Sequence, residues 1–286
     1  MANLSVWKNE TEAPSFPSLN GDIEVDVVIV GGGITGITAA YLLSISGKSV
    51  AVLEARKVAG SSTGFSTGNL YATIGGEGLH KVAQKHGDQK LTEIVQSRAA
   101  AVDFIEQIIA TNQIQCDFKR VPWSLFTVDG ESSSFVQKER EAAQKAGLQV
   151  MSEVTYSQAV KEGFAVMNQA QFDPYKYVVG LASKIQSDNC RIYENTVALK
   201  MEEGEVCVVE TEHGRVTASQ IVMATHTPKG IYMVHTSLGP YREYAVAARL
   251  NNTEPQPGIY WEMQETEHYS VRTCDSSEGK LIMVLG

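Results

Sequence analysis

The sequence is short of basic residues and has no closely paired cysteines, and each shortage argues against a class of protein. The 286 residues include 24 Lys and Arg against 33 Asp and Glu, which gives a net charge of −9. Nucleic-acid-binding surfaces need clustered Lys and Arg, so we expect none here. The four cysteines form no C-x-x-C pair, which predicts reduced, packed thiols and no metal site. They are Cys116, Cys190, Cys207 and Cys274.

The sequence also lacks the marks of secretion and of membrane insertion. Residues 1–20 contain no apolar core of the signal-peptide type, so we expect a cytoplasmic protein. Residues 27–47 carry no formal charge and are long enough to cross a bilayer. Asp26 precedes this stretch, a β-branched run opens it and its glycines have a motif spacing, so we predict no membrane span. With 43% apolar residues, the chain can form one large domain or two intermingled ones.

One stretch, residues 26–56, has the pattern strand, glycine turn, helix, strand, acid. An apolar run ends at Val30, and Gly31, Gly33 and Gly36 then fill the motif G-x-G-x-x-G. A second apolar run ends at Glu54, at nearly the spacing expected of an acid that binds ribose hydroxyls. A lone glycine motif is weak evidence, but a complete βαβ unit with its acid predicts a dinucleotide site. The alternative is a glycine turn that only closes an ordinary βα unit.

Each part of this unit has a physical role in holding a dinucleotide. Gly31 permits the sharp turn, Gly33 lets the backbone approach a pyrophosphate, and Gly36 lets helix and strand pack closely. The unpaired N–H groups and the dipole at the helix start favour the phosphate charge.

No second βαβ unit follows, which disfavours an NAD-dependent dehydrogenase. Residues 60–69 instead form a loop of Gly, Ser and Thr, which offers amides and hydroxyls without bulk. We interpret it as a segment that wraps a phosphate and ribitol chain; the alternative is a flexible surface loop.

Helical periodicity predicts a helix over residues 91–109, with Asp88 as its N-cap. Residues 118–128 read as a strand that Pro122 interrupts, at an edge or a bulge. Asp173 followed by Pro174 predicts the start of a helix that ends near Lys184. We also expect a helix over residues 132–145.

Short strands dominate the later sequence. We predict strands at residues 191–193, 196–200, 205–210, 214–218 and 220–225, and expect the last of these to be buried and to return to the first sheet in parallel. Alternating runs at residues 241–248, 258–262, 269–273 and 281–285 suggest an antiparallel sheet in a second domain.

Together, the βαβ unit, the Ser/Thr/Gly loop and the strand ending Ala224-Thr225 resemble the FAD-dependent oxidoreductases of the D-amino-acid-oxidase (DAO) superfamily. Residues 168–174, 224–226 and 269–272 resemble more closely a subgroup in which this flavin module precedes a C-terminal Rieske iron–sulfur domain. The resemblance implies an α/β fold: a Rossmann-like FAD/NAD(P)-binding domain with a second α+β domain built on an antiparallel sheet. We expect the FAD-binding domain at residues 1–90 plus 190–235, and the substrate domain at 91–189 plus 236–286.

The resemblance also implies which residues hold FAD. The pyrophosphate would lie at the glycine turn, the adenosine ribose at Glu54 and the adenine at Val197, while His226 stands where most relatives have glycine. The implied cofactor-binding residues are Gly31, Gly33, Ile34, Thr35, Gly36, Glu54, Ala55, Arg56, Ser62, Thr63, Ser66, Gly68, Asn69, Val197, Ala224 and Thr225.

In relatives, the strand at 281–285 leads into further sheet and a closing helix. This chain stops at Gly286 and has no C-x-H or C-x-x-H pair for Rieske ligands. We therefore expect it to be a fragment of a longer protein, truncated in the substrate domain.

The implied reaction is hydride removal from an amine or amino acid to flavin N5, with electrons passing to an iron–sulfur centre in the longer protein. Arg272 could clamp a substrate carboxylate, or could be an ion-paired strand residue. Gln171 and Tyr244 are further catalytic candidates, and Gln169 and Tyr241 further substrate-side ones. The alternatives are an NAD(P)-dependent dehydrogenase and a non-catalytic dinucleotide-binding module. The expected partner is a small amine or amino acid, and the sequence leaves the oligomeric state open.

Overall fold

The computed structural model describes residues 5–7, 13–75, 78–128, 132–154, 156, 160–227, 243–250, 256–264, 268–276 and 279–286. The chain divides into two compact units, each assembled from separate stretches of sequence. The first unit comprises Met1–Ser66, Asn112–Cys116 and Asp173–Pro240, and the second comprises Thr67–Thr111, Asp117–Phe172 and Tyr241–Gly286. These units differ from the expected domain boundaries, because residues 67–90 belong to the second unit and residues 173–189 to the first.

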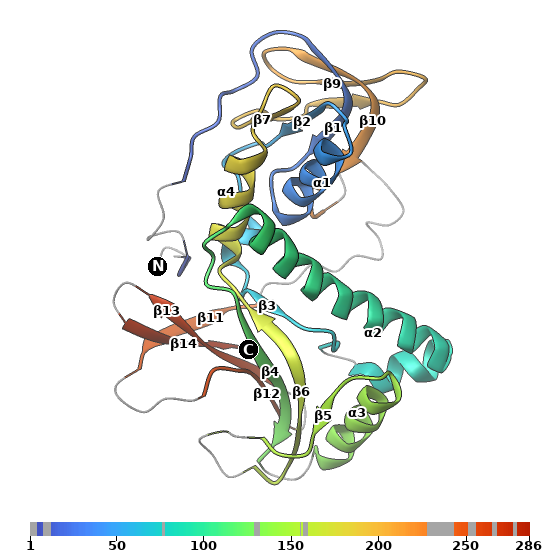
Figure 1. The fold of residues 1–286 in the computed structure, drawn as a ribbon, viewed down its shortest axis with the longest axis vertical. Helices are drawn as coiled ribbons and strands as arrows, with labels where there is room; N and C mark the ends of the chain where they lie inside the picture. Colours follow the sequence, from blue (N-terminus) through green and yellow to red (C-terminus); the bar gives the residue numbers. More distant parts are fainter. Residues whose placement is uncertain are drawn as a thin grey trace. The chain divides into compact units, whose positions relative to one another are not determined.

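The first unit is built on a six-stranded sheet whose four neighbouring strands β7, β2, β1 and β10 are parallel (Figure 1). The predicted return of the late strand is confirmed, because β10 pairs in parallel with β1, Val30 beside Met223. β9 and β8 extend the sheet in antiparallel fashion. In sheet order the strands are β7 (Cys190–Tyr193), β2 (Val50–Leu53), β1 (Ile23–Val30), β10 (Arg215–Met223), β9 (Cys207–Glu210) and β8 (Lys200–Glu202).

The continuous apolar runs explain the buried strands, and two helices pack beside them. All four residues of β2 are buried, as are the last four of β1. Helix α1 (Ile34–Ile45) contacts both strands and also packs against α4 (Pro174–Ile185). The predicted start of α4 is confirmed: the Asp173 carboxylate accepts hydrogen bonds from the amides of Tyr175 and Lys176, both at 2.9 Å.

Three strand predictions in this unit were wrong in part. Residues 196–199 form no strand, and β8 begins only at Lys200. Residues 214–218 and 220–225 were expected as two strands, but Arg215–Met223 is one strand, β10. Its end was expected to be buried, yet Met223 is 44% exposed because it lines the pocket described below.

The second unit is built on a sheet in the order β11-β14-β13-β12-β4-β6-β3, and β5 also pairs with β6. Its pairs are antiparallel as predicted, except that β12 runs parallel to β4. The strands are β3 (Asn69–Leu70), β4 (Lys119–Thr127), β5 (Val150–Met151), β6 (Glu162–Gln171), β11 (Ala245–Arg249), β12 (Ile259–Met263), β13 (His268–Ser276) and β14 (Gly279–Leu285).

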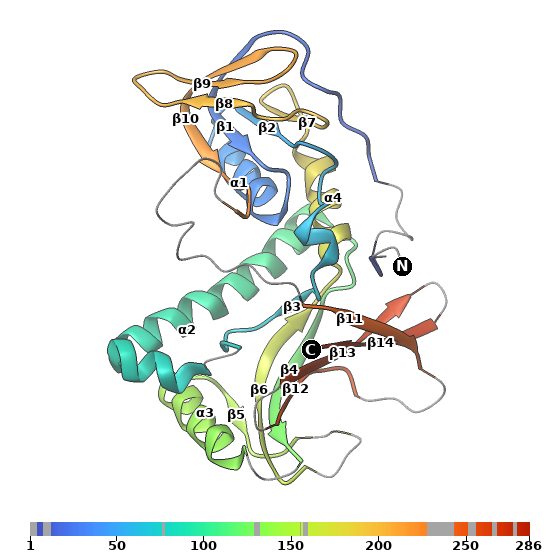
Figure 2. The same cartoon turned by 180° about the vertical axis from the view of Figure 1, so that it is seen from behind.

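Figure 2 shows helices α2 (Gly78–Asn112) and α3 (Ser133–Lys145). Both contribute buried residues to the main core of this unit. α2 starts well before the predicted residue 91, and Gly87 (φ 81°) interrupts it, so that Asp88 follows a kink. The buried Glu139 of α3 holds the start of α2 by accepting the Leu79 and His80 amides at 2.8 Å each. Of the two alternatives predicted at Pro122, an edge or a bulge, the structure has the bulge, since the register shifts between Val121 and Trp123 and β4 is paired on both sides.

Within the described part of the chain, no helix combines the length and apolarity needed to cross a membrane.

Candidate functional site

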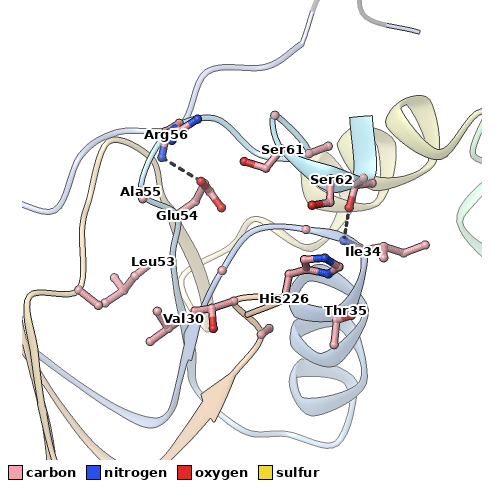
Figure 3. A pocket seen from close by; sticks show the side chains of 18 of the residues that line it. Val30, Ile34, Thr35, Leu53, Glu54, Ala55, Arg56, Ser61, Ser62 and His226 are labelled. Atoms are coloured by element: carbon pink, nitrogen blue, oxygen red, sulfur yellow. Dashed lines mark hydrogen bonds between the residues drawn. The ribbon is translucent and has the colours of Figure 1, made fainter. Parts of the chain in front are cut away.

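A pocket of about 820 Å³ opens in the first unit where β1, β2 and β10 end and α1 begins (Figure 3). In open α/β sheets this edge, at the carboxyl ends of the strands, is where ligands bind. The pocket is lined by all the predicted cofactor-binding residues except Gly36, Gly68 and Asn69.

Two glycines at the turn after β1 leave no room for a side chain. A β-carbon on Gly31 would lie 2.4 Å from the Ala224 carbonyl oxygen, and one on Gly36 would lie 1.9 Å from the Gly31 oxygen. Gly31 also has a φ of 116°, which side chains disfavour. Gly36 does not line the pocket. Its lack of a side chain lets α1 pack closely against the turn.

The first turn of α1 faces the pocket with its amide groups. Gly33 is the N-cap and supplies no side-chain cap, and the first turn contains no acidic residue. The Ile34 amide donates to the Thr63 hydroxyl at 3.1 Å. A β-carbon on Gly33 would meet only that hydroxyl, at 3.2 Å, so Gly33 leaves the helix start open on the pocket side. A helix start whose N-cap residue has no side chain, and whose first turn has no acidic residue, favours a phosphate group.

The Glu54 carboxylate at the end of β2 also lines the pocket. It accepts hydrogen bonds from the Gly32 amide at 2.7 Å and from the Arg56 amide at 2.8 Å. Both oxygens therefore have fixed positions, and each retains a lone pair for a further donor such as a ribose hydroxyl.

A buried carboxylate that sequence reasoning missed holds the loop after Glu54. Glu194 is 1% exposed and accepts hydrogen bonds from the Val58 amide at 2.8 Å and the Phe16 amide at 3.3 Å. The Lys57 ammonium pairs with it at 2.6 Å. Glu194 directly follows β7, just as Glu54 directly follows β2. An acidic residue at the end of a second predicted strand is the sequence feature that could have identified Glu194.

Other lining residues lie beside predicted ones and were not named as cofactor-binding, although the resemblance had drawn attention to His226. Ala59, Gly60 and Ser61 precede Ser62, Thr196 and Ala198 flank Val197, and Met223 and His226 flank Ala224-Thr225. The sequence therefore identified the segments that line the pocket and many, but not all, of the lining residues within them.

Two predicted cofactor residues lie in the second unit. The Gly68 carbonyl accepts the Phe172 amide at 3.0 Å, and Asn69 pairs with Gln171 in the sheet. Neither is among the residues that line the pocket of the first unit, and their part in cofactor binding stays a prediction.

The catalytic candidates also belong to the second unit, where two of them contact main-chain carbonyls. Arg272 is 4% exposed and donates to the Thr67 and Phe172 oxygens. Gln171 donates to the Gly258 oxygen at 2.7 Å. Tyr244 is 65% exposed.

Of the two further candidates, Gln169 is also tied to the backbone. Its side chain accepts the Ala72 amide at 2.7 Å and donates to the Met167 oxygen at 2.7 Å. Tyr241 lies outside the described residues. Among those residues, no group of three or more His, Cys, Asp or Glu could hold a metal ion.

The pocket fits an adenine dinucleotide in three respects. A β-carbon on Gly31 or Gly36 would overlap neighbouring backbone atoms, the first helical turn contains no acidic residue, and the strand-end carboxylate is held in place. These are the features expected of a dinucleotide site in a doubly wound sheet.

Comparisons with known proteins agree with this fold. The family model DAO, FAD dependent oxidoreductase, matches residues 26–284. The chain is 33% identical over 290 residues to a Bacillus subtilis protein named as a Rieske 2Fe-2S iron–sulfur protein, YhfW; the match covers 98% of this chain and 55% of YhfW. It is 24% identical over 219 residues to the gamma-glutamylputrescine oxidoreductase of Escherichia coli, covering 73% of this chain and 50% of that enzyme. The chain thus spans about half the length of these curated relatives.

Solved structures share the fold at low sequence identity. Glycine oxidase from Geobacillus kaustophilus superposes with a TM-score of 0.67 at 17% identity, over 91% of this chain and 70% of that one. The L-amino acid deaminase from Proteus myxofaciens superposes with a TM-score of 0.69 at 17% identity, over 96% and 62%. The chain belongs to the DAO family of FAD-dependent oxidoreductases, as its glycine turn and late strand predicted.

Proposed function

We propose that the protein oxidises an amine or an amino acid at a C–N bond, with FAD held in the pocket of the first unit. The observation that carries this proposal is the pocket itself, where the start of α1 and the fixed Glu54 carboxylate face one space. The names of relatives support the substrate class, since they include a gamma-glutamylputrescine oxidoreductase and a glycine oxidase.

The chain's own residues would bind and orient the cofactor. The amides at the start of α1 would hold the diphosphate, Glu54 would accept hydrogen bonds from the adenosine ribose, and Val197 would meet the adenine through its backbone. When bound, the flavin supplies a hydride acceptor, and the protein must orient substrate and exclude water. Gly33 contributes by leaving the diphosphate position free of side-chain volume.

Arg272, Gln171 and Tyr244 stay proposals for the substrate side. The Nη1 of Arg272 donates to the Thr67 and Phe172 oxygens and its Nε to the Thr273 oxygen, so these contacts would fix the direction of the guanidinium toward a substrate carboxylate. If Arg272 binds a carboxylate, Arg272→Lys should raise KM for amino acids and leave KM for simple amines unchanged. Equal changes for both substrate classes would instead indicate a scaffolding role.

We further propose that, in a longer protein of this kind, electrons pass from the flavin to an iron–sulfur centre. The support is the similarity to YhfW, whose name includes a Rieske centre. Anaerobic addition of the substrate to the full-length gene product should then produce the electron paramagnetic resonance signal of a reduced iron–sulfur cluster.

An anaerobic reduction screen tests the main proposal. The purified protein is loaded with FAD and mixed with amines, amino acids and hydroxy acids while the visible flavin absorbance is followed. We expect bleaching by one or more amines or amino acids. Bound flavin that none of them bleaches would favour a non-catalytic binding module.

Two variants make the screen specific to the pocket. Gly33→Val should remove the flavin, because a side chain would occupy the diphosphate position. Gly204→Ala is the matched control, since a β-carbon there makes only ordinary contacts, the nearest at 3.5 Å. Flavin retained by Gly33→Val would contradict the site assignment.

A further inference from the structure

The segment after β10 ends in a tight turn centred on His226. The Thr227 amide donates to the Thr225 carbonyl at 2.7 Å, and the Thr225 hydroxyl donates to the Thr227 carbonyl at 2.7 Å. His226 has a φ of 64°, in the left-handed region that glycine adopts freely and asparagine more readily than most residues. A histidine here imposes a backbone cost that glycine would avoid.

This turn is placed directly beside the glycine turn of the pocket. The Ala224 amide donates to the Val30 carbonyl at 2.9 Å, and the Ala224 β-carbon lies 3.4 Å from where a β-carbon on Gly36 would be. His226 lies two residues further along. It lines the same pocket as Ile34 and Thr35, and Figure 3 shows its ring near the start of α1.

The imidazole therefore offers a hydrogen-bond donor where the diphosphate of a dinucleotide would lie. A neutral imidazole carries one N–H donor and an imidazolium two, whereas glycine offers only its main-chain amide. The Ile34 amide already donates to the Thr63 hydroxyl, so a further donor at this end of the pocket would add to the remaining amides of α1.

We propose that the His226 side chain binds the diphosphate of FAD by donating a hydrogen bond to a phosphate oxygen, and that this contact offsets the cost of its left-handed backbone. The inference rests on the proposed cofactor site and adds a cofactor-binding residue to it. It predicts that FAD affinity depends on a donor at position 226, and not only on the shape of the turn.

Two substitutions separate the side chain from the turn. His226→Gly keeps the left-handed conformation without strain and removes the donor, while His226→Asn keeps both the conformation and an amide donor. Titration of the apoprotein with FAD, followed by flavin fluorescence, should give a dissociation constant about 10- to 100-fold higher for His226→Gly, the equivalent of a hydrogen bond to a charged group. For His226→Asn we expect most of the affinity to remain.

Two further measurements identify the group that is bound. The melting temperature of the His226→Gly apoprotein should equal or exceed that of the wild type, which shows that lost affinity is not lost folding. In calorimetric titrations, ADP should reproduce the loss caused by His226→Gly, whereas adenosine, which has no phosphate, should bind equally to both proteins.

Equal binding of FAD by His226→Gly and the wild type would overturn the inference and leave the cofactor site intact. Equal losses in His226→Gly and His226→Asn would overturn the hydrogen-bond assignment. If the wild type bound no FAD, the proposed function would fail first and the role of His226 with it.

Discussion

The Glu54 carboxylate accepts a hydrogen bond from the Gly32 amide at 2.7 Å, within the glycine turn itself. The same side chain accepts the Arg56 amide at 2.8 Å. The residue proposed to bind the ribose therefore also fixes the turn that faces the diphosphate, so its removal should affect both the fold and cofactor binding.

We expect Glu54→Ala to weaken FAD binding by roughly 1–3 kcal/mol, because a charged acceptor is lost. It should also lower the free energy of unfolding of the apoprotein by about 1–2 kcal/mol, since two amides lose their partner. Fluorescence titration and urea unfolding measure the two effects. Glu24→Ala, at an exposed position of β1, is the control and should change neither. Unchanged flavin content in Glu54→Ala would contradict the assigned role.

Two glycines of the turn should respond to alanine in different ways. In Gly36→Ala the new β-carbon would overlap the Gly31 oxygen, a backbone atom that cannot move aside cheaply. We expect a loss of about 3 kcal/mol in unfolding free energy, at the upper end of overpacking costs. In Gly33→Ala the β-carbon meets only the Thr63 hydroxyl, so the fold should lose about 1 kcal/mol or less.

The affinity for FAD should also distinguish Gly33→Ala from Gly36→Ala. Gly33→Ala should reduce FAD affinity more than its small loss of stability explains, because its β-carbon faces the diphosphate position. Calorimetric titration of FAD beside thermal melts of both variants tests this. If Gly33→Ala bound FAD with wild-type affinity, the diphosphate could not lie beside Gly33, and the proposed position would be wrong.

Glu194 should matter for stability although it does not line the pocket. Glu194→Ala leaves the buried amides of Val58 and Phe16 without an acceptor, so we expect a loss of about 2–4 kcal/mol in unfolding free energy. Lys57→Ala should cost less than about 1 kcal/mol, because the lysine side chain is 55% exposed. Urea unfolding measures both, with the exposed Glu205→Ala as control. Equal costs for Lys57→Ala and Glu194→Ala would mean that the ion pair, and not the amides, carries the effect.

Cys190, in β7 of the first unit, should make the protein less stable at alkaline pH. Burial raises the pKa of its thiol from 9.0 to about 11, so between these values the folded chain holds a proton that the unfolded chain has lost. The unfolding free energy should therefore fall as the pH rises above 9, by about 2 kcal/mol at pH 11.

Cys190→Ala should reduce this slope, and tyrosines whose pKa burial also raises, such as Tyr177 and Tyr260, should account for the rest. Any packing loss shifts the stability of the variant equally at every pH, so the comparison of unfolding free energies at pH 7 and pH 10.5 isolates the titration. An unchanged difference between the two pH values would show that other groups cause the alkaline loss.

The βαβ unit could be predicted because its signals are local. Apolar runs, glycine spacing and the acid after β2 all lie within residues 26–56, and the cap of α4 needs only Asp173 and Pro174. The family, its FAD cofactor and its fold class were predicted from these and from the late strand. The cytoplasmic location stays a prediction.

The features that the sequence did not reveal depend on contacts distant in sequence. Gly68 and Asn69 continue the Ser/Thr/Gly loop without a break in composition, yet pairing with β6 places Asn69 in the second unit. The apolar end of β10 reads as buried, but Met223 lines a pocket. The Arg272 and Gln171 contacts with carbonyl groups could not be read from residue type, because every backbone offers such acceptors.

The pairing of β1 with β10 has a consequence for synthesis of the chain. The register joins Ile23 to Val216 and Val30 to Met223, so the sheet around the pocket needs a strand translated long after the first one. Until then one edge of β1 has open hydrogen-bonding groups, the kind of edge that invites aggregation. During synthesis, the first unit therefore cannot complete its sheet until residue 223 has left the ribosomal exit tunnel.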